Sequence, residues 1–267
     1  LSAGELRIRH TEFSDNESAV AGGAISNGTT MVISDSIFTG NRVTTAASSF
    51  GGGGAIYNTS IRGQAQITTS LLTDNEAFKG GAIMNFNAAD LILRNCDVVA
   101  NRVGFGSGGG IYNDGSGAVI TIIDSRVNDN DASVSFGSGG GIFSGDGGSL
   151  ILENCEVTRN LASNDGGGAV ASAGRIPNSR IENNRSVSGE GGGLYHSGLK
   201  GLEIIASSIS GNMARYDGGG LATFVGTSNQ PAGISISDSR ISSNTSEFGS
   251  GGGIANTEQG RVSILRS

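Results

Sequence analysis

Apolar residues recur along this chain in short alternating runs that are separated by Gly, Asn and Asp. Residues 139–160, GGGIFSGDGGSLILENCEVTRN, form one unit in which an apolar residue follows the glycines and two alternating runs precede a closing asparagine. Runs of two to five alternating residues bounded by turn residues predict short β-strands. Such a unit cannot bury its apolar side alone, so it needs a copy of itself above and below.

The units align when each is counted back from its closing asparagine. Positions three and eight residues before that asparagine are apolar in every unit, and a third apolar position follows the glycines. Three apolar columns predict three short strands per coil, stacked in three parallel sheets. The first and last closing asparagines are 228 residues apart over eight steps, or 28.5 residues per step. They are Asn16, Asn41, Asn75, Asn101, Asn130, Asn160, Asn184, Asn212 and Asn244.

No helical periodicity interrupts the repeat, which favours an all-β, right-handed parallel β-helix of about nine coils. We expect residues 1–267 to form a single domain of nine repeats and a truncated tenth. The spacing between the closing asparagine and the next glycines varies most, so each coil should have a fixed core and one variable loop. Because the last coil stops before its third strand, we expect a segment of a longer protein. Its ends would meet flanking β-helix coils or associate end to end.

Composition narrows the possible classes of protein. The chain has 47 glycines without a triplet period, which excludes collagen, and regularly placed aliphatic residues argue against disorder. A net charge of −7 disfavours a nucleic-acid partner, because phosphate binding needs a clustered basic face. No run of about 18 apolar residues predicts a transmembrane helix. The first 24 residues also lack the basic-then-apolar pattern of a signal peptide.

Paired motifs connect the repeat to a known family. GGAISN with FSDN, GGAIYN with FTGN, and GGAIMN with LTDN resemble the GGAI and FxxN motifs of chlamydial polymorphic outer membrane proteins (Pmp). Related repeats occur in large bacterial surface proteins with pectate-lyase-like folds. The FxxN phenylalanine is present only as Phe13 and Phe38, and later units have Leu, Val or Ile. The resemblance implies a bacterial cell-surface or secreted scaffold or adhesin. A polysaccharide lyase or glycoside hydrolase of the same fold is the alternative.

The recurrent asparagines predict a structural ladder. The side-chain amide can donate and accept along the stacking direction, and Asn tolerates the left-handed backbone of a tight turn. Glycine runs such as residues 106–110 and 137–141 superficially suggest a nucleotide site, but no helix follows to bind phosphate, so we predict no cofactor. We expect these glycines to allow positive φ and close approach of coils. A second, broken ladder is predicted at Asn27, Asn58, Asn85, Asn113 and Asn256.

Two cysteines and three aspartates are candidates for special chemistry. Cys96 and Cys155 share a column of small residues, two coils or ~9.6 Å apart. This exceeds the roughly 4.4–6.8 Å that a disulfide spans, so both are expected to be free thiols. Asp35, Asp124 and Asp238 share a corner column at least three coils apart, too far to bind one metal ion. We therefore predict no metal site and assign no catalytic residue.

The strongest candidate for binding is a stripe of aromatic and sulfur-containing side chains, Tyr57, Met84, Tyr112, Phe143 and Tyr195. Each directly follows the third apolar column and points outward by alternation. An exposed stripe of this kind can stack on the sugar rings of a host or matrix glycan or dock a protein. Alternatively, loop aromatics just before the glycines cover the stripe or pack beneath it. These are Phe50, Phe78, Phe105, Phe136, Tyr216 and Phe248.

Overall fold

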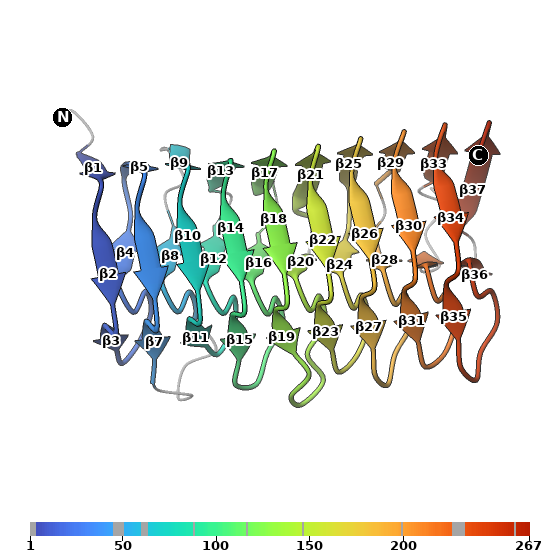
Figure 1. Cartoon of the computed structure of the whole chain (residues 1–267), viewed down its shortest axis with the longest axis horizontal. Coiled ribbons are helices and arrows are strands. Elements are labelled where there is room, and N and C mark those ends of the chain that lie inside the picture. Colours follow the sequence, from blue (N-terminus) through green and yellow to red (C-terminus); the bar gives the residue numbers. More distant parts are fainter. Residues whose placement is uncertain are drawn as a thin grey trace.

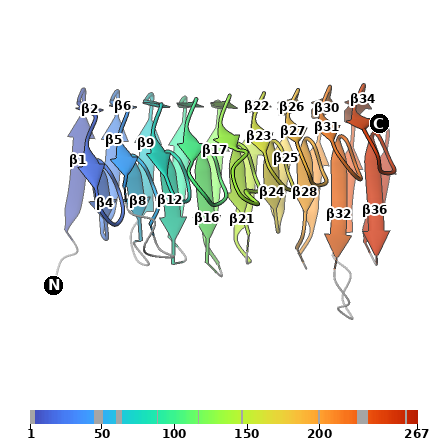
Figure 2. The ribbon, with the colours of Figure 1, turned by 90° about the horizontal axis from the view of Figure 1, so that it is seen from below.

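The computed structural model describes residues 4–44, 51–59, 64–87, 89–115, 117–145, 147–198, 200–225, 233–258 and 260–267. Each repeat winds once around a common axis and adds one strand to each of four parallel sheets, A to D (Figure 1). The turns stack in sequence order into an elongated rod with the termini at opposite ends (Figure 2). This is the predicted all-β parallel solenoid. None of the described residues belongs to a helix that is long and apolar enough to cross a membrane.

Sheet A contains strands of four or five residues, which alternate between buried and more exposed positions. In β17, Ile120 and Ile122 are fully buried between half-exposed neighbours. The alternating columns of the sequence therefore correspond to the inner face of this sheet. In stacking order its strands are β1 (Glu5–Arg9), β5 (Thr30–Ser34), β9 (Gln64–Thr68), β13 (Asp90–Arg94), β17 (Val119–Ile123), β21 (Ser149–Glu153), β25 (Gly174–Pro177), β29 (Leu202–Ile205), β33 (Gly233–Ser237) and β37 (Arg261–Leu265).

Sheet B contains three-residue strands, whose central side chain is the apolar residue three positions before the closing asparagine. The two phenylalanines of this column, Phe13 and Phe38, stack with their ring centroids 4.9 Å apart. The strands are β2 (Glu12–Ser14), β6 (Ile37–Thr39), β10 (Leu71–Thr73), β14 (Asp97–Val99), β18 (Arg126–Asn128), β22 (Glu156–Thr158), β26 (Arg180–Glu182), β30 (Ser208–Ser210) and β34 (Arg240–Ser242).

Sheet C shows that the prediction of three sheets was wrong. The closing asparagine does not end the coil, because the next two residues form a further strand. Each such strand directs one small side chain inward, as Ala77 and Ala132 do, which is too short a run to show alternation. The strands are β3 (Glu17–Ser18), β7 (Arg42–Val43), β11 (Glu76–Ala77), β15 (Arg102–Val103), β19 (Asp131–Ala132), β23 (Leu161–Ala162), β27 (Arg185–Ser186), β31 (Met213–Ala214) and β35 (Thr245–Ser246).

Sheet D begins each strand with the third apolar column, so that Ile83 pairs with Ile56 on one side and Ile111 on the other. All three are fully buried in the core. The strands are β4 (Ile25–Asn27), β8 (Ile56–Asn58), β12 (Ile83–Phe86), β16 (Ile111–Asp114), β20 (Ile142–Ser144), β24 (Ala169–Ala171), β28 (Leu194–His196), β32 (Leu221–Val225) and β36 (Ile254–Glu258).

Two left-handed corners connect sheets A, B and C. The A–B corner includes Asp35, Asp124 and Asp238, with φ of 52°, 49° and 51°. The B–C corner residue directly precedes the closing asparagine, as Asp74 does with φ of 56°. Our interpretation that the closing asparagine itself adopts the left-handed backbone was therefore wrong. Asp and Asn suit such corners because their short polar side chains reduce the strain of positive φ.

The closing asparagines form the predicted ladder inside the rod. Each side-chain Nδ2 donates to Oδ1 of the asparagine in the next turn, at 2.8–3.0 Å in all eight steps. The same oxygen also accepts the backbone N–H of the preceding turn's asparagine, as between Asn101 and Asn130 at 3.0 Å. Asn130 Nδ2 donates to the Val98 carbonyl as well, at 2.9 Å. This ladder therefore satisfies buried backbone groups in addition to its own amides.

The second ladder lies on the inner face of sheet D and is broken, as predicted. Side-chain bonds of 2.8–3.0 Å lead through four asparagines to Ser144. Ala171 and His196 then occupy the equivalent positions. A ladder side chain also holds the linker that leads to sheet A, for example Asn85 Nδ2 donating to the Ala89 carbonyl at 2.7 Å. The ladder therefore fixes the D–A linkers wherever its side chain can reach them.

The glycine triplets allow the chain to enter sheet D. Each of these sequences is Gly-Gly followed by Ala or Gly, and its first glycine has positive φ, for example +68° at Gly53. A Cβ on the second, Gly54, would overlap the carbonyl oxygen of Gly81 in the next turn. Both functions expected of these glycines, left-handed backbone and close approach, are therefore present.

The outer face of sheet C carries charges that alternate in sign. From turn to turn the register pairs Glu17, Arg42, Glu76, Arg102 and Asp131. Arg42 contacts Glu17 at 2.7 Å and Arg102 contacts Glu76 at 2.8 Å. These charged groups neutralise one another on the surface.

Candidate functional site

The predicted stripe lies on the outer face of sheet D. Tyr57, Met84, Tyr112 and Phe143 pair in register across four consecutive turns. The rings of Tyr112 and Phe143 stack with centroids 5.0 Å apart. Tyr195 is separated from them by Val170 and begins no further aromatic run, since Ala222 follows it. The stripe is therefore continuous over its first four members.

The C–D loops cover the middle of this stripe. Met84 is 1% exposed and Tyr112 is 5% exposed. Gly52 leaves room for Met84, because a Cβ at this glycine would overlap Sδ. Lys79 Nζ lies 4.9 Å from the centroid of the Tyr112 ring and 3.4 Å from its hydroxyl. The middle of the stripe is therefore closed to a ligand, whereas its other members are half-exposed.

The loop aromatics face the solvent over the C–D edge. The loops that carry these rings cover the middle of the stripe through Gly52 and Lys79. Phe105, Phe136, Tyr216 and Phe248 themselves remain exposed. Phe78 stacks on Phe105 with ring centroids 4.9 Å apart. Phe50 lies outside the described residues. We call the four solvent-facing residues the loop aromatic row: Phe105 (51% exposed), Phe136 (86%), Tyr216 (46%) and Phe248 (72%).

Phe136 is the most exposed member of this row, and its backbone is unusual. Ser135 and Phe136 have φ of +39° and +65°, although neither is glycine. A bulky residue with positive φ is a true outlier. At the other end of the row, the Arg215 guanidinium lies 4.9 Å from the Phe248 ring centroid and 5.9 Å from that of Tyr216. The row thus combines a strained, protruding ring with a pair of rings that contact a cation.

Three carboxylates between the two ends of the row escaped the sequence analysis. Asp165, Glu190 and Asp217 each precede the glycine triplet of one of three successive turns. Backbone hydrogen bonds join these turns: the Gly166 N–H donates to the Glu190 carbonyl at 2.9 Å, and the Gly191 N–H donates to the Asp217 carbonyl at 3.0 Å. Burial raises the pKa of Asp165. Burial also raises the pKa of Glu190, and the charges of the other two acids raise it further. The pKa of Tyr195 is raised by burial and by the charges of Asp165 and Glu190.

The hydrogen bonds of these acids are largely structural. Asp165 Oδ1 accepts the Glu190 N–H at 2.9 Å, and its Oδ2 accepts from Asn164 Nδ2 at 3.1 Å. Asp217 Oδ1 accepts the N–H of Ser250. The signal for this cluster was present in the sequence as an acid before GGG in three consecutive units. Alignment on the closing asparagines does not reveal it, because loops of variable length separate each asparagine from the next glycines.

The remaining candidates occupy structural positions. Cys96 and Cys155 are buried and unpaired. Each stands in a ladder of small side chains, where its N–H donates to a serine Oγ of the next turn at 3.0 Å. Asp238 pairs with Arg266, which lowers the pKa of this carboxyl. Within the described ranges, no group of three or more His, Cys, Asp or Glu side chains could hold a metal ion.

Comparisons with known proteins agree with this architecture. A family model described as a right handed beta helix region matches residues 109–266, which is more than half of the chain. The Chlamydia polymorphic membrane protein repeat matches residues 10–28. A search of curated proteins finds no match, and neither does a search of solved structures.

Proposed function

Because the chain belongs to the right-handed β-helix family, we propose that it is a rigid, non-catalytic segment of a bacterial cell-surface or secreted adhesin. The match of residues 10–28 to the Chlamydia polymorphic membrane protein repeat supports a surface location. The chain then acts as a scaffold that displays its C–D loops to a host or matrix partner.

The loop aromatic row is the observation that carries this proposal. Phe136 is 86% exposed and Phe248 is 72% exposed, although aromatic side chains normally gain stability from burial. Aromatic rings concentrated along one edge are a frequent sign of a binding surface. Their faces can stack on sugar rings or pack against apolar protein groups.

The ladders support the scaffold part of the proposal. Buried polar groups of neighbouring turns satisfy one another, and the turns repeat at ~4.8 Å. Loops on successive turns are therefore held at fixed intervals along the rod. A partner that contacts several loops meets a surface that needs little ordering, which favours affinity.

Adhesion of beads coated with the chain tests the proposal. We expect a variant with Phe136→Ser and Phe248→Ser to bind cultured epithelial cells or immobilised matrix about tenfold less well, because exposed aromatic anchors carry much of the energy of an interface. Ile37→Ser is the matched control, since Ile37 is 42% exposed on sheet B. Thermal melting verifies folding in both variants. Wild-type adhesion by the double variant would overturn the proposal.

A polysaccharide lyase or glycoside hydrolase is the second candidate, and the carboxylates of Asp165 and Glu190 favour it. Catalytic acids often have raised pKa values, and glycoside hydrolysis uses a pair of carboxyl groups. The measurement is release of reducing ends or unsaturated products from a polysaccharide panel. Turnover by the wild type that Glu190→Gln abolishes would support the enzyme. No turnover, with adhesion retained in Glu190→Gln, would support the adhesin.

A further inference from the structure

A cavity of about 400 Å³ opens on the D–A edge, away from the loop aromatic row. It arises where one turn is short: only 24 residues separate Asn160 from Asn184. In that turn two residues connect β24 to β25, whereas four connect β20 to β21 and five connect β28 to β29. The described residues of the longer linkers on both sides border a gap above the short one. We call this cavity the D–A notch.

The D–A notch has one aromatic wall. Tyr112 stacks on one face of the Phe143 ring, but the residue in register on the other side is the smaller Val170. The remaining face of Phe143 therefore lines the cavity together with glycines of its own linker. An apolar ring face of this kind suits the apolar face of a sugar.

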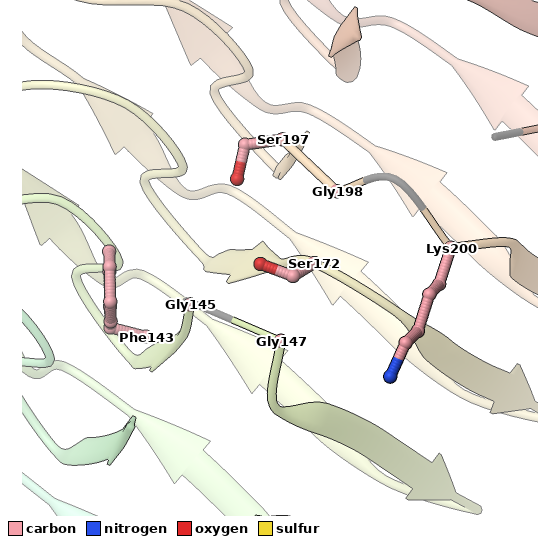
Figure 3. Close-up of a pocket in the computed structure, with 7 residues that line it drawn as sticks. All are labelled: Phe143, Gly145, Gly147, Ser172, Ser197, Gly198 and Lys200. Carbon is pink, nitrogen blue, oxygen red and sulfur yellow. The ribbon is translucent and has the colours of Figure 1, made fainter. Parts of the chain in front are cut away.

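The opposite side of the D–A notch is polar and cationic. Ser172, Ser197 and Lys200 line it (Figure 3). In this view the Ser172 hydroxyl points toward the Phe143 side, and the Ser197 hydroxyl points toward Ser172. Among the residues that the structure describes, the Lys200 ammonium and these two hydroxyls have no hydrogen-bond or ion-pair partner. Within the described part of the chain, Lys200 is thus an unpaired cation, and the net charge of the whole chain is −7.

His196 holds this side of the cavity in place. Its Nε2 lies 2.9 Å from the Lys200 carbonyl oxygen, so the buried imidazole closes the linker that carries Ser197 and Lys200. Ala171 has no side-chain amide that could close the neighbouring linker in the same way. The D–A notch is thus fixed on one side by a buried hydrogen bond and left open over the short turn.

We propose that the D–A notch binds a single terminal sugar unit that carries a carboxylate. Phe143 stacks on the ring, Lys200 pairs with the carboxylate, and the serine hydroxyls bind the sugar hydroxyls. The flanking linkers lie one turn to each side, or ~9.6 Å apart. This separation admits one ring and blocks a glycan chain lying along the rod. Sugar units in the interior of a glycan chain are therefore excluded from the cavity. The free acidic sugar should bind as the terminal unit does, because it has the same ring and carboxylate.

Isothermal titration calorimetry with glucuronic acid, glucose and acetate tests the proposal on the whole chain. We expect glucuronic acid to bind at least about tenfold more tightly than either comparison compound, because only it offers both a ring and a charge. Lys200→Gln should abolish the preference over glucose. Arg240→Gln, which removes an exposed charge on sheet B, is the matched control and should keep it. Phe143→Leu should weaken both sugars while circular dichroism confirms the fold.

A second titration compares a glycan that ends in glucuronate with an isomer that has the glucuronate inside the chain. It tests whether the cavity binds only a terminal unit. Binding of the terminal form and the free sugar, without the internal form, is expected. No glucuronate binding, equal affinity for glucose, or an unchanged preference in Lys200→Gln would overturn the proposal. The variant with Phe136→Ser and Phe248→Ser should bind glucuronate normally. If that variant loses adhesion but still binds glucuronate, the inference about the D–A notch is unaffected. If the wild type does not bind glucuronate but adhesion depends on the loop aromatic row, the proposed adhesin function is unaffected.

Discussion

The two polar ladders inside the rod differ in what their oxygens accept. In the ladder of closing asparagines, each Oδ1 accepts both a side-chain N–H and a backbone N–H, as at Asn130. In the sheet D ladder, Oδ1 of Asn85 accepts from the side chain of Asn58 in the preceding turn. The first ladder remains intact through nine asparagines, whereas the second changes to Ser144, Ala171 and His196. The first ladder thus bonds the backbone of the neighbouring turn at each step, whereas the backbone bonds of the second ladder lie mainly within its own turn, as between Asn85 and Ala89.

This difference also determines where the rod can vary. The first ladder borders a corner formed by a single left-handed residue, so the chain has no freedom of length there. The second borders the D–A linkers, whose lengths differ from turn to turn. The D–A notch forms in the region where the second ladder is broken. The length of a turn therefore varies at the D–A linkers and is fixed at the corner beside the first ladder.

The two ladders are compared most directly by the losses of folding stability that Asn130→Ala and Asn85→Ala cause. The first change leaves the buried N–H of Asn101 without a partner and removes the side-chain hydrogen bond to the Val98 carbonyl, and we expect a loss of about 3 kcal/mol. The second leaves only the Ala89 carbonyl and side-chain amides unsatisfied, so about 2 kcal/mol is expected. Urea unfolding measures both. Equal losses would show that the backbone bonds do not distinguish the ladders.

His196→Asn places an asparagine at this position of the second ladder and should change how the stability of the protein responds to pH. Burial lowers the pKa of His196 below its ordinary 6.5, and its Nδ1 has no partner within the described structure. The neighbouring ladder positions are Ala171 and Thr223, neither of which is charged. The unfolded chain therefore takes up a proton more readily, and stability falls as pH drops from about 6.5 toward the folded pKa.

The variant removes that proton site, because Asn reaches the carbonyl four residues ahead as Asn85 does. Its urea midpoint should fall less than that of the wild type between pH 7 and pH 5. The raised pKa values of Asp165 and Glu190 act in the opposite direction, but they are common to both proteins and cancel in the difference. Parallel pH profiles would show that His196 does not titrate in this range.

The smallest effect is expected in the serine and cysteine ladder. Cys155 Sγ contacts the carbonyl oxygens of Ile122 and Glu153 at 3.2 Å, and Ser179 in the next turn makes the equivalent contacts with its hydroxyl. Cys155→Ser should therefore change stability by less than about 1 kcal/mol. Burial raises the pKa of both thiols to about 11, so a thiol reagent at pH 8 should react only after denaturation. Rapid labelling of the native protein would contradict this burial.

Periodicity predicted the buried face of three sheets but missed the fourth. Columns such as Ile122 and Val127 are visible because an apolar residue recurs at a fixed distance from an asparagine. Ala77 and Ala132 on sheet C are small and stand alone between polar residues, so no alternation marks them. The left-handed corner was placed one residue too late, because Asp, Ala, Arg, Asn and Ser all occupy that position.

The candidate site was harder to predict than the fold, because it depends on loop conformation. Alternation correctly placed Met84 and Tyr112 on the outer face, but only the loop coordinates show that Lys79 lies over Tyr112. Phe136 had the same sequence signal as Phe78, yet the two rings have different surroundings. The D–A notch also depends on differences in linker length between adjacent turns, which become visible only when sheet boundaries are known.

The alternating charges on sheet C have a consequence for the evolution of this rod. Glu17, Arg42, Glu76, Arg102 and Asp131 change sign at every turn. Duplication of one turn would place two like charges side by side, which is unfavourable in a sheet. Duplication of two turns would keep every neighbour opposite in sign. This part of the rod can therefore lengthen by an even number of turns without placing like charges side by side, whereas an odd number would place them so.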